Sequence, residues 1–316
     1  MARASKKTTG GKTTRKSAKA SPKGPTLMAR FRTWFFRPSR LATTALFLGI
    51  LVLGPYVIHL IPELSERDEY QYPLSELRLS PPHEWVPSTF VQDVLDDAEL
   101  PETVSLLDTT LTRDLAEAFA NHPWVQQVEQ VRITPDRQIE VAIAYRHPRA
   151  MVELSAGTYP IDEDGVLLPP SDFSPADIGR FPLITGIATP PQGPAGTSWG
   201  SDQVLSAAHL AVLLTPERDL DKYWNRFGLK AIRPLSPGDG KGPPTFVLKT
   251  VGESEIIWGH APGADELEPT AEQKIGRLEY YLSQYGSFDQ EGGPYRIDIR
   301  EFQAITLEPL EMPQYR

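Results

Sequence analysis

Three patterns in the sequence bring together residue types that could do chemistry, and the first is a serine between two glycines. Residues 196–200 read Gly-Thr-Ser-Trp-Gly, the G-x-S-x-G pattern of a nucleophile elbow, in which a sharp turn after a strand exposes the serine hydroxyl. Residues 189–195 are rich in proline and predict a loop, not the strand that this chemistry needs. An exported serine hydrolase that uses Ser198 is therefore kept only as an alternative interpretation.

The second pattern is acidic. Residues 162–165 read Asp-Glu-Asp-Gly, which matches part of a calcium-binding loop. A complete loop needs further oxygen ligands on both sides, whereas Tyr159 and Pro160 precede this stretch and three apolar residues follow it. An Asp-Gly pair between two apolar runs predicts a hairpin turn instead.

The third pattern is a set of histidines without metal-binding spacing. No H-x-x-x-H or H-E-x-x-H pair occurs among the histidines at 83, 122, 147, 209 and 260, and the sequence has neither cysteine nor a glycine-rich phosphate loop. The sequence therefore predicts no catalytic residue, no metal, no cofactor and no small-molecule substrate. We expect a protein that works through its binding surfaces.

Charge is divided unevenly along the chain. Twelve of the 32 basic residues and none of the 41 acidic ones fall in residues 1–40, which leaves 20 basic against 41 acidic residues in the remainder, a net charge of −21 there. The first 26 residues hold almost no large apolar group and predict disorder. A basic tail could bind nucleic acid, but the apolar stretch that follows favours a positive-inside signal, so no nucleic acid is expected as a partner.

The apolar stretch is residues 41–61, which contain no Asp, Glu, Lys or Arg. Twenty-one helical residues span roughly 30 Å, the thickness of a bilayer core. We therefore expect one transmembrane helix, with the basic tail in the cytoplasm and residues 62–316 outside the inner membrane. A cleaved signal peptide is the alternative, which the long leading segment disfavours.

A compact α+β module is expected after a polar spacer. Residues 74–80 predict a strand, and helices are expected over 88–98 and 112–121. Residues 131–133 and 139–145 alternate apolar and polar side chains around a Thr-Pro-Asp-Arg turn, which is the period of half-buried strands. The predicted order is β-α-α-β-β.

This module resembles the POTRA domain of the FtsQ/DivIB family of bacterial cell-division proteins. The resemblance rests on three elements in a fixed order. These are Pro123-Trp124-Val125 at the entry, Pro135-Asp136 at the turn, and Arg146, Pro148 and Ala150 at the exit. The family commonly has Glu where Tyr145 stands, so the match is incomplete.

The rest of the chain predicts short strands and two helices. Helices are expected over residues 203–214 and 271–285, the second with Ile275, Leu278, Tyr281 and Leu282 inward and Lys274, Arg277 and Glu279 toward water. The last two strands are expected over residues 295–300 and 303–308. The hairpin near 162–165, residues 181–186 and the Arg-Ile-Asp-Ile-Arg strand at 296–300 are also similar to the family, so the resemblance extends over about residues 74–308.

The last strand is the candidate binding site. If it lies at a sheet edge, its unpaired N–H and C=O groups can accept a strand from another protein. The alternative is that this edge is covered from within the chain. The resemblance implies that this edge binds FtsB/FtsL-like membrane division proteins, while the POTRA domain contacts further partners. The predicted partner-binding residues are Phe302, Gln303, Ala304, Ile305, Thr306 and Leu307.

Together these expectations describe a non-enzymatic divisome scaffold of the cell inner membrane, concentrated at the division septum, with its C-terminal domains periplasmic. The main alternative is a POTRA-containing component of protein export or outer-membrane assembly, although neither repeated POTRA units nor a barrel is predicted.

The fold class expected is α+β, a single transmembrane helix followed by the POTRA domain and a mixed β-rich domain with two flanking helices. The expected segments are a disordered basic tail (1–40), the transmembrane helix (41–61), a spacer (62–73), the POTRA domain (74–149), the β domain (150–309) and a C-terminal tail (310–316).

Overall fold

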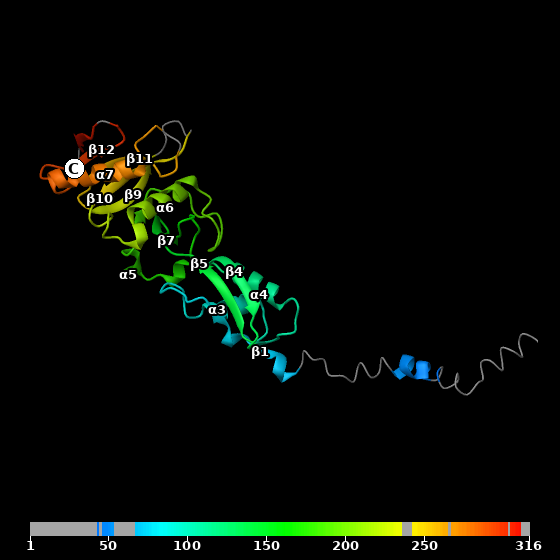
Figure 1. The fold of residues 1–316 in the computed structure, drawn as a ribbon. Helices are drawn as coiled ribbons and strands as arrows, with labels where there is room; N and C mark the ends of the chain where they lie inside the picture. The colour runs from blue at the N-terminus through cyan, green and yellow to red at the C-terminus, as the bar shows by residue number, and fades with distance from the viewer. Residues whose placement is uncertain are drawn as a thin grey trace, which may run out of the picture. The chain divides into compact units, whose positions relative to one another are not determined.

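The computed structural model describes residues 43, 46–53, 67–235, 242–264, 267–302 and 304–310. Contacts divide the chain into two units, Met1–Glu63 and Leu64–Arg316. The chain is an α+β protein with a large mixed sheet, which lies in the second unit (Figure 1). We refer to residues 67–149 as the three-stranded module and to residues 150–310 as the eight-stranded module.

The predicted transmembrane helix over residues 41–61 is wrong for the part of it that the structure describes. Residues 46–53 are helical, and the positions directly before and after them lie outside the described residues. No helix within the described residues is long and apolar enough to cross a membrane. Residues 54–61 and the basic tail at 1–40 lie outside the described residues.

The three-stranded module carries two helices beside its sheet. Its sheet has the order β2-β5-β4, and a separate pair joins β1 to β3. The core contains side chains from both helices and from β5. The elements are β1 (Gln71–Pro73), β2 (Arg78–Leu79), α3 (Phe90–Asp97), β3 (Thr103–Ser105), α4 (Leu111–Ala120), β4 (Val125–Ile133) and β5 (Ile139–Tyr145).

The central strand β5 confirms the alternating pattern that was predicted from the sequence. Ile139, Val141, Ile143 and Tyr145 are buried, while the residues between them are partly exposed. The turn before β5 is also confirmed, because Thr134 and Gln138 are joined by a backbone hydrogen bond of 2.8 Å. The strand therefore buries one face against the helices, as its period requires.

The beginning of this module differs from the prediction. Residues Leu74–Glu76 form a 3-10 helix, and only Arg78 and Leu79 pair with β5. Leu74 is fully buried, and its N–H donates to the carbonyl of Glu102 at 2.9 Å. This contact holds Leu74 against the segment before β3, so the chain turns here instead of continuing as one strand.

The eight-stranded module is built on one sheet with the order β13-β12-β11-β10-β9-β8-β6-β7. The sheet is mixed, because β6–β8, β8–β9 and β11–β12 are parallel pairs and the others are antiparallel. The strands are β6 (Ala150–Leu154), β7 (Gly157–Ile161), β8 (Leu183–Ile184), β9 (Leu229–Leu235), β10 (Thr245–Thr250), β11 (Glu255–His260), β12 (Tyr295–Asp298) and β13 (Thr306–Pro309).

Two helices pack on one face of this sheet. The shared core contains Val204 of α6 (Asp202–Leu214), Leu278 of α7 (Ala271–Tyr285), and Phe246 and Leu248 of β10. Phe246 and Leu248 lie two residues apart in a strand and so point to the same face. A third, short helix, α5 (Pro175–Ile178), precedes β8. Helix α7 comes directly before the last two strands in the chain. The predicted binding site lies around the last of these strands.

Candidate partner-binding edge

Strand β13 is one of the two outer strands of the eight-stranded sheet within the described residues, and β7 is the other. It pairs antiparallel with β12 on one side, with Leu307 opposite Ile297 and Glu308 opposite Arg296. All four of its residues are exposed. Within the described residues, Thr306–Pro309 therefore lie at an edge of the sheet, and the strand begins later than the expected 303–308, because residues 304 and 305 are not part of it.

The direction of the backbone groups in β13 follows from one hydrogen bond. The N–H of Leu310 donates to the carbonyl of Pro294 at 2.8 Å, so Leu310 faces β12. Because N–H and C=O groups alternate sides along an antiparallel strand, Glu308 and Thr306 also face β12, while Leu307 and Pro309 face away. Leu307 therefore offers a donor and an acceptor outward, whereas Pro309 offers only its carbonyl.

An apolar groove of about 380 Å³ lies beside this edge. Its walls come from α7 and from the segment that leads into β13. Three large rings in it are mostly exposed, those of Tyr280, Tyr285 and Phe302. The lining residues are Arg277, Tyr280, Tyr281, Tyr285, Phe302, Ala304, Ile305 and Leu307.

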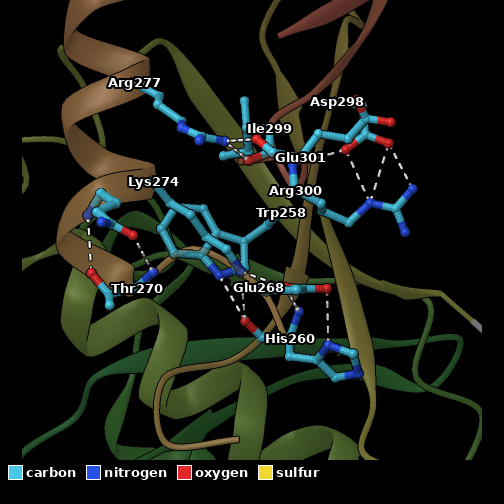
Figure 2. Close-up of polar contacts among 11 residues, drawn as sticks. Trp258, His260, Glu268, Thr270, Lys274, Arg277, Asp298, Ile299, Arg300 and Glu301 are labelled. Carbon is cyan, nitrogen blue, oxygen red and sulfur yellow. Dashed lines mark hydrogen bonds and ion pairs between the residues drawn. The ribbon is translucent and has the colours of Figure 1, made fainter. Parts of the chain in front are cut away.

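Arg277 of α7 fixes the connection between β12 and β13 (Figure 2). Its guanidinium donates to the carbonyl oxygens of Ile299 (2.8 Å), Phe302 (2.5 Å) and Glu301. A planar guanidinium with five N–H donors in a fixed fork can serve several acceptors at once in this way. Arg277 was expected to face water. Instead it holds the chain that carries Phe302 and leads to the edge strand.

An ionic group anchors the first turn of α7, and Figure 2 shows its residues. Lys274 is only 3% exposed, and its Nζ lies 2.6 Å from Glu268 Oε2. Glu268 also accepts hydrogen bonds from the backbone N–H and the ring Nδ1 of His260, each at 3.0 Å. The ammonium lies 5.3 Å from the ring centre of Trp258. The expectation that Lys274 faces water is therefore wrong, because Glu268 supplies the charge partner that allows its burial.

The protonation of this pair follows from its surroundings. Burial lowers the pKa of Lys274, and Glu268 only partly opposes this effect. Burial alone would raise the pKa of Glu268, but the hydrogen bonds from Lys274 and His260 outweigh it and the pKa is lowered. The 2.6 Å contact between Nζ of Lys274 and Oε2 of Glu268 has the length of a charge-assisted hydrogen bond, so we treat the two residues as an ion pair that supports α7.

The structure brings most of the predicted partner-binding residues together. Phe302, Ala304, Ile305 and Leu307 line the groove, and Thr306 lies in β13. Gln303 lies outside the described residues. Ile305 is partly buried against the core of the module, so Leu307 is the more accessible of the two apolar strand residues.

Three residues of the groove, Arg277, Tyr280 and Tyr285, were not among the predicted partner-binding residues. A signal for the two tyrosines was present, because large rings on the solvent face of an amphipathic helix are unusual enough to indicate contact with something. Arg277 carried no such signal, since an arginine on that face normally points into water.

The other patterns singled out in the sequence have structural explanations. Residues 162–165 form the predicted hairpin turn, in which Asp162 accepts from the N–H groups of Asp164 (2.9 Å) and Val166 (2.8 Å). Ser198 forms an isolated bridge with Val166, and no named strand occurs over residues 189–200. That segment lacks the strand-then-turn geometry that a nucleophile elbow requires.

The comparisons with known proteins add no relative. No protein-family model matches the chain, and no curated protein matches it. The likeness to FtsQ/DivIB proteins therefore depends only on the residues quoted above.

Proposed function

We propose that this chain is a non-enzymatic scaffold of bacterial cell division, which captures an extended segment of a partner protein by strand addition at β13. The observation that carries the proposal is the position of β13 as an outer strand of the sheet, with Leu307 directing its N–H and C=O outward. The resemblance to the FtsQ/DivIB family supplies the partner, an FtsB/FtsL-like division protein.

Strand addition fits this edge for two reasons. Main-chain hydrogen bonds give affinity without special side chains, and a neighbouring pocket selects among sequences. The groove between β13 and α7 is such a pocket, because Tyr280, Tyr285 and Phe302 give it an apolar, aromatic wall. An incoming strand with apolar residues at every second position would place them along this wall.

The test is capture of an FtsB-like segment from the same organism by the purified chain. Leu307→Glu places a charge on the edge and in the groove, so we expect binding to fall by at least about tenfold, since a desolvated charge without a partner costs more than 1.4 kcal/mol. Val251→Glu is the matched control, because Val251 is also an exposed apolar residue, in the turn after β10. Equal binding by both variants would exclude the edge as the docking site.

A second measurement tests the cellular role. A fluorescently tagged chain is expected to concentrate at the division septum, and the Leu307→Glu variant is expected to lose the FtsB-like protein there. A signal spread evenly through the cell would contradict the role in division even if strand capture were observed.

A further inference from the structure

A second cavity has a volume of about 180 Å³. Its lining residues fall between positions 83 and 220, so none belongs to the β13 edge, and several of them are positively charged. Side chains from three regions meet there: His83 before α3, His147 and Arg149 after β5, and Arg180 and Arg218 from the eight-stranded module. Glu84 is the acidic residue of this lining. The positive lining stands out because residues 41–316 carry a net charge of −21.

Arg149 is buried without a matching hydrogen-bond acceptor. Its side chain is 11% exposed, and its Nε is buried and has no hydrogen-bond partner within the described residues. The nearest carboxylate oxygen is Oε2 of Glu163, at 3.8 Å from Nε, which is too far for a hydrogen bond. Buried arginines normally have such partners, so this guanidinium has donor capacity available to a ligand.

Arg218 adds a second positive charge that no neighbour neutralises. Its side chain makes no ion pair or hydrogen bond to the described part of the chain, although it is close enough to Arg149 and His147 to lower the pKa of both, after the larger effect of burial. Arg218 and Glu217 both have positive φ, 64° and 57°. Two successive residues in this region are uncommon outside glycine, and here they place Arg218 at the rim of the cavity.

Arg180, in contrast, is already neutralised. Its Nη2 lies 2.7 Å from Oε1 of Glu84, and its guanidinium stacks over the ring of Trp85 at 4.3 Å. Arg180 and Glu84 therefore form part of the wall. Arg218 supplies a positive charge without an ion pair in the described part of the chain, and Arg149 adds a guanidinium whose carboxylate neighbour, Glu163, lies 3.8 Å from Nε.

The two histidines of the cavity lining differ in their hydrogen bonds. The Nδ1 of His83 accepts from the N–H of Trp85 at 3.2 Å, so its Nε2 carries the hydrogen and donates to the carbonyl of Arg146 at 2.8 Å. His83 is thus fully partnered. The ring of His147 lies 4.2 Å from that of His83 and makes no hydrogen bond within the described residues. A ring N–H of His147 is therefore available to an acceptor in the cavity.

We propose that Arg149, Arg218 and His147 bind a phosphate group in this cavity. The two guanidinium groups supply only donors, and the neutral imidazole of His147 can donate from one of its ring nitrogens, which matches an acceptor-only ligand. The volume suits one such group and not a large ligand. Bound phosphate would supply the acceptors that the Arg149 guanidinium lacks and would separate two like charges. This inference does not depend on the proposed role of β13.

Isothermal titration calorimetry of the full chain with inorganic phosphate, at constant ionic strength, tests the site. Arg218→Gln is the first variant, because an exposed side chain without a partner can be replaced without unfolding the protein. Arg149→Gln is the second, with circular dichroism to check its fold. We expect each to weaken binding by about tenfold, the effect of one charge-assisted hydrogen bond. Arg113→Gln, an exposed arginine of α4, is the control with the same charge change.

Three results would overturn the proposal: no binding by the unaltered chain at millimolar phosphate, equal weakening by all three variants, or binding unchanged in Arg218→Gln. A parallel titration with glycerol 1-phosphate identifies the source of the phosphate. Binding of the ester as tight as that of the free ion indicates a phosphate carried on a larger molecule, and exclusion of the ester indicates the free ion. Failure here would leave strand capture at β13 unaffected, so the two proposals are separable.

Discussion

The guanidinium of Arg277 donates to the carbonyl oxygen of Phe302 at 2.5 Å, which ties the middle of α7 to the segment that leads into the edge strand. Two further carbonyls of the same connection, those of Ile299 and Glu301, accept from the same side chain. The position of β13 therefore depends on a helix residue as well as on its pairing with β12. The contribution of Arg277 to the stability of the β13 edge can therefore be measured before any partner protein is identified.

Replacement of Arg277 by Met should loosen the edge while leaving the rest of the sheet intact. Hydrogen bonds to a charged group contribute about 1.5–3 kcal/mol, so we expect a loss of about 2 kcal/mol in the free energy of unfolding. Amide hydrogen exchange should become faster in residues 304–310 but not in β9 or β10. Arg226→Met is the control, because Arg226 also contacts α7, through an exposed ion pair with Glu279. Equal effects of the two variants would show that Arg277 has no special role.

Proline substitutions distinguish the two sides of β13. The N–H of Glu308 faces β12, so Glu308→Pro removes a ladder hydrogen bond and should cost about 2 kcal/mol. The N–H of Leu307 faces away from β12, so Leu307→Pro should cost less than about 1 kcal/mol in stability. Urea unfolding of the two variants measures the difference. A larger loss for Leu307→Pro would mean that the outward groups of β13 are already paired.

The buried pair of Lys274 and Glu268 should behave differently from an exposed one. Lys274→Met leaves the Glu268 carboxylate buried with only His260 as donor, which should cost about 3 kcal/mol. The double variant Lys274→Met with Glu268→Gln should recover part of that loss, since no lone charge remains. In a double-mutant cycle, both single variants and the double variant of a pair are compared. Such a cycle on the exposed pair of Lys230 and Glu253 should show a coupling free energy between the two side chains of about 0.5 kcal/mol or less. Unfolding free energies of the six variants test the contrast.

Stability should depend on His147 at mildly acidic pH. Burial, with further contributions from His83, Arg218 and Arg149, lowers the pKa of His147 from 6.5 to about 4. Between these two values the unfolded chain binds a proton that the folded chain does not, so stability falls as the pH decreases from 6.5 toward 4. His147→Gln should reduce this dependence, as measured by urea unfolding across that range. Phosphate should also reduce it if it binds beside the imidazole, because an anion favours the protonated ring. An identical slope in His147→Gln would show that this ring stays solvated.

The sequence predicted best those elements whose stability is local. The period of two over residues 139–145 follows from alternating burial in β5, and the predicted bounds of α7, residues 271–285, agree with the structure because Thr270 and Gln273 form a capping box and Gly286 ends the helix in a left-handed conformation. These signals lie within a few residues of the element that they define. They do not depend on which other segments pack nearby.

The prediction over residues 41–61 was wrong for a related reason. Hydropathy measures how apolar a stretch is but not whether the chain forms there a helix of the length that a bilayer needs, and no such helix occurs among the described residues. Composition alone therefore could not decide this element.

The sequence by itself determined the α+β class, the alternation in β5 and the limits of α7. Only the tertiary structure decided that Lys274 is buried, because its partner Glu268 reaches it by folding back from the segment before α7, and that Arg277 holds the connection to β13. It also decided that Arg149, Arg218 and His147 share a cavity, since they come from parts of the chain about seventy residues apart. Lys274 and Glu268 are six residues apart but on different segments, and the other contacts join residues far apart in the chain. Side-chain periodicity encodes neither kind of contact, because it describes only which face of one element is apolar.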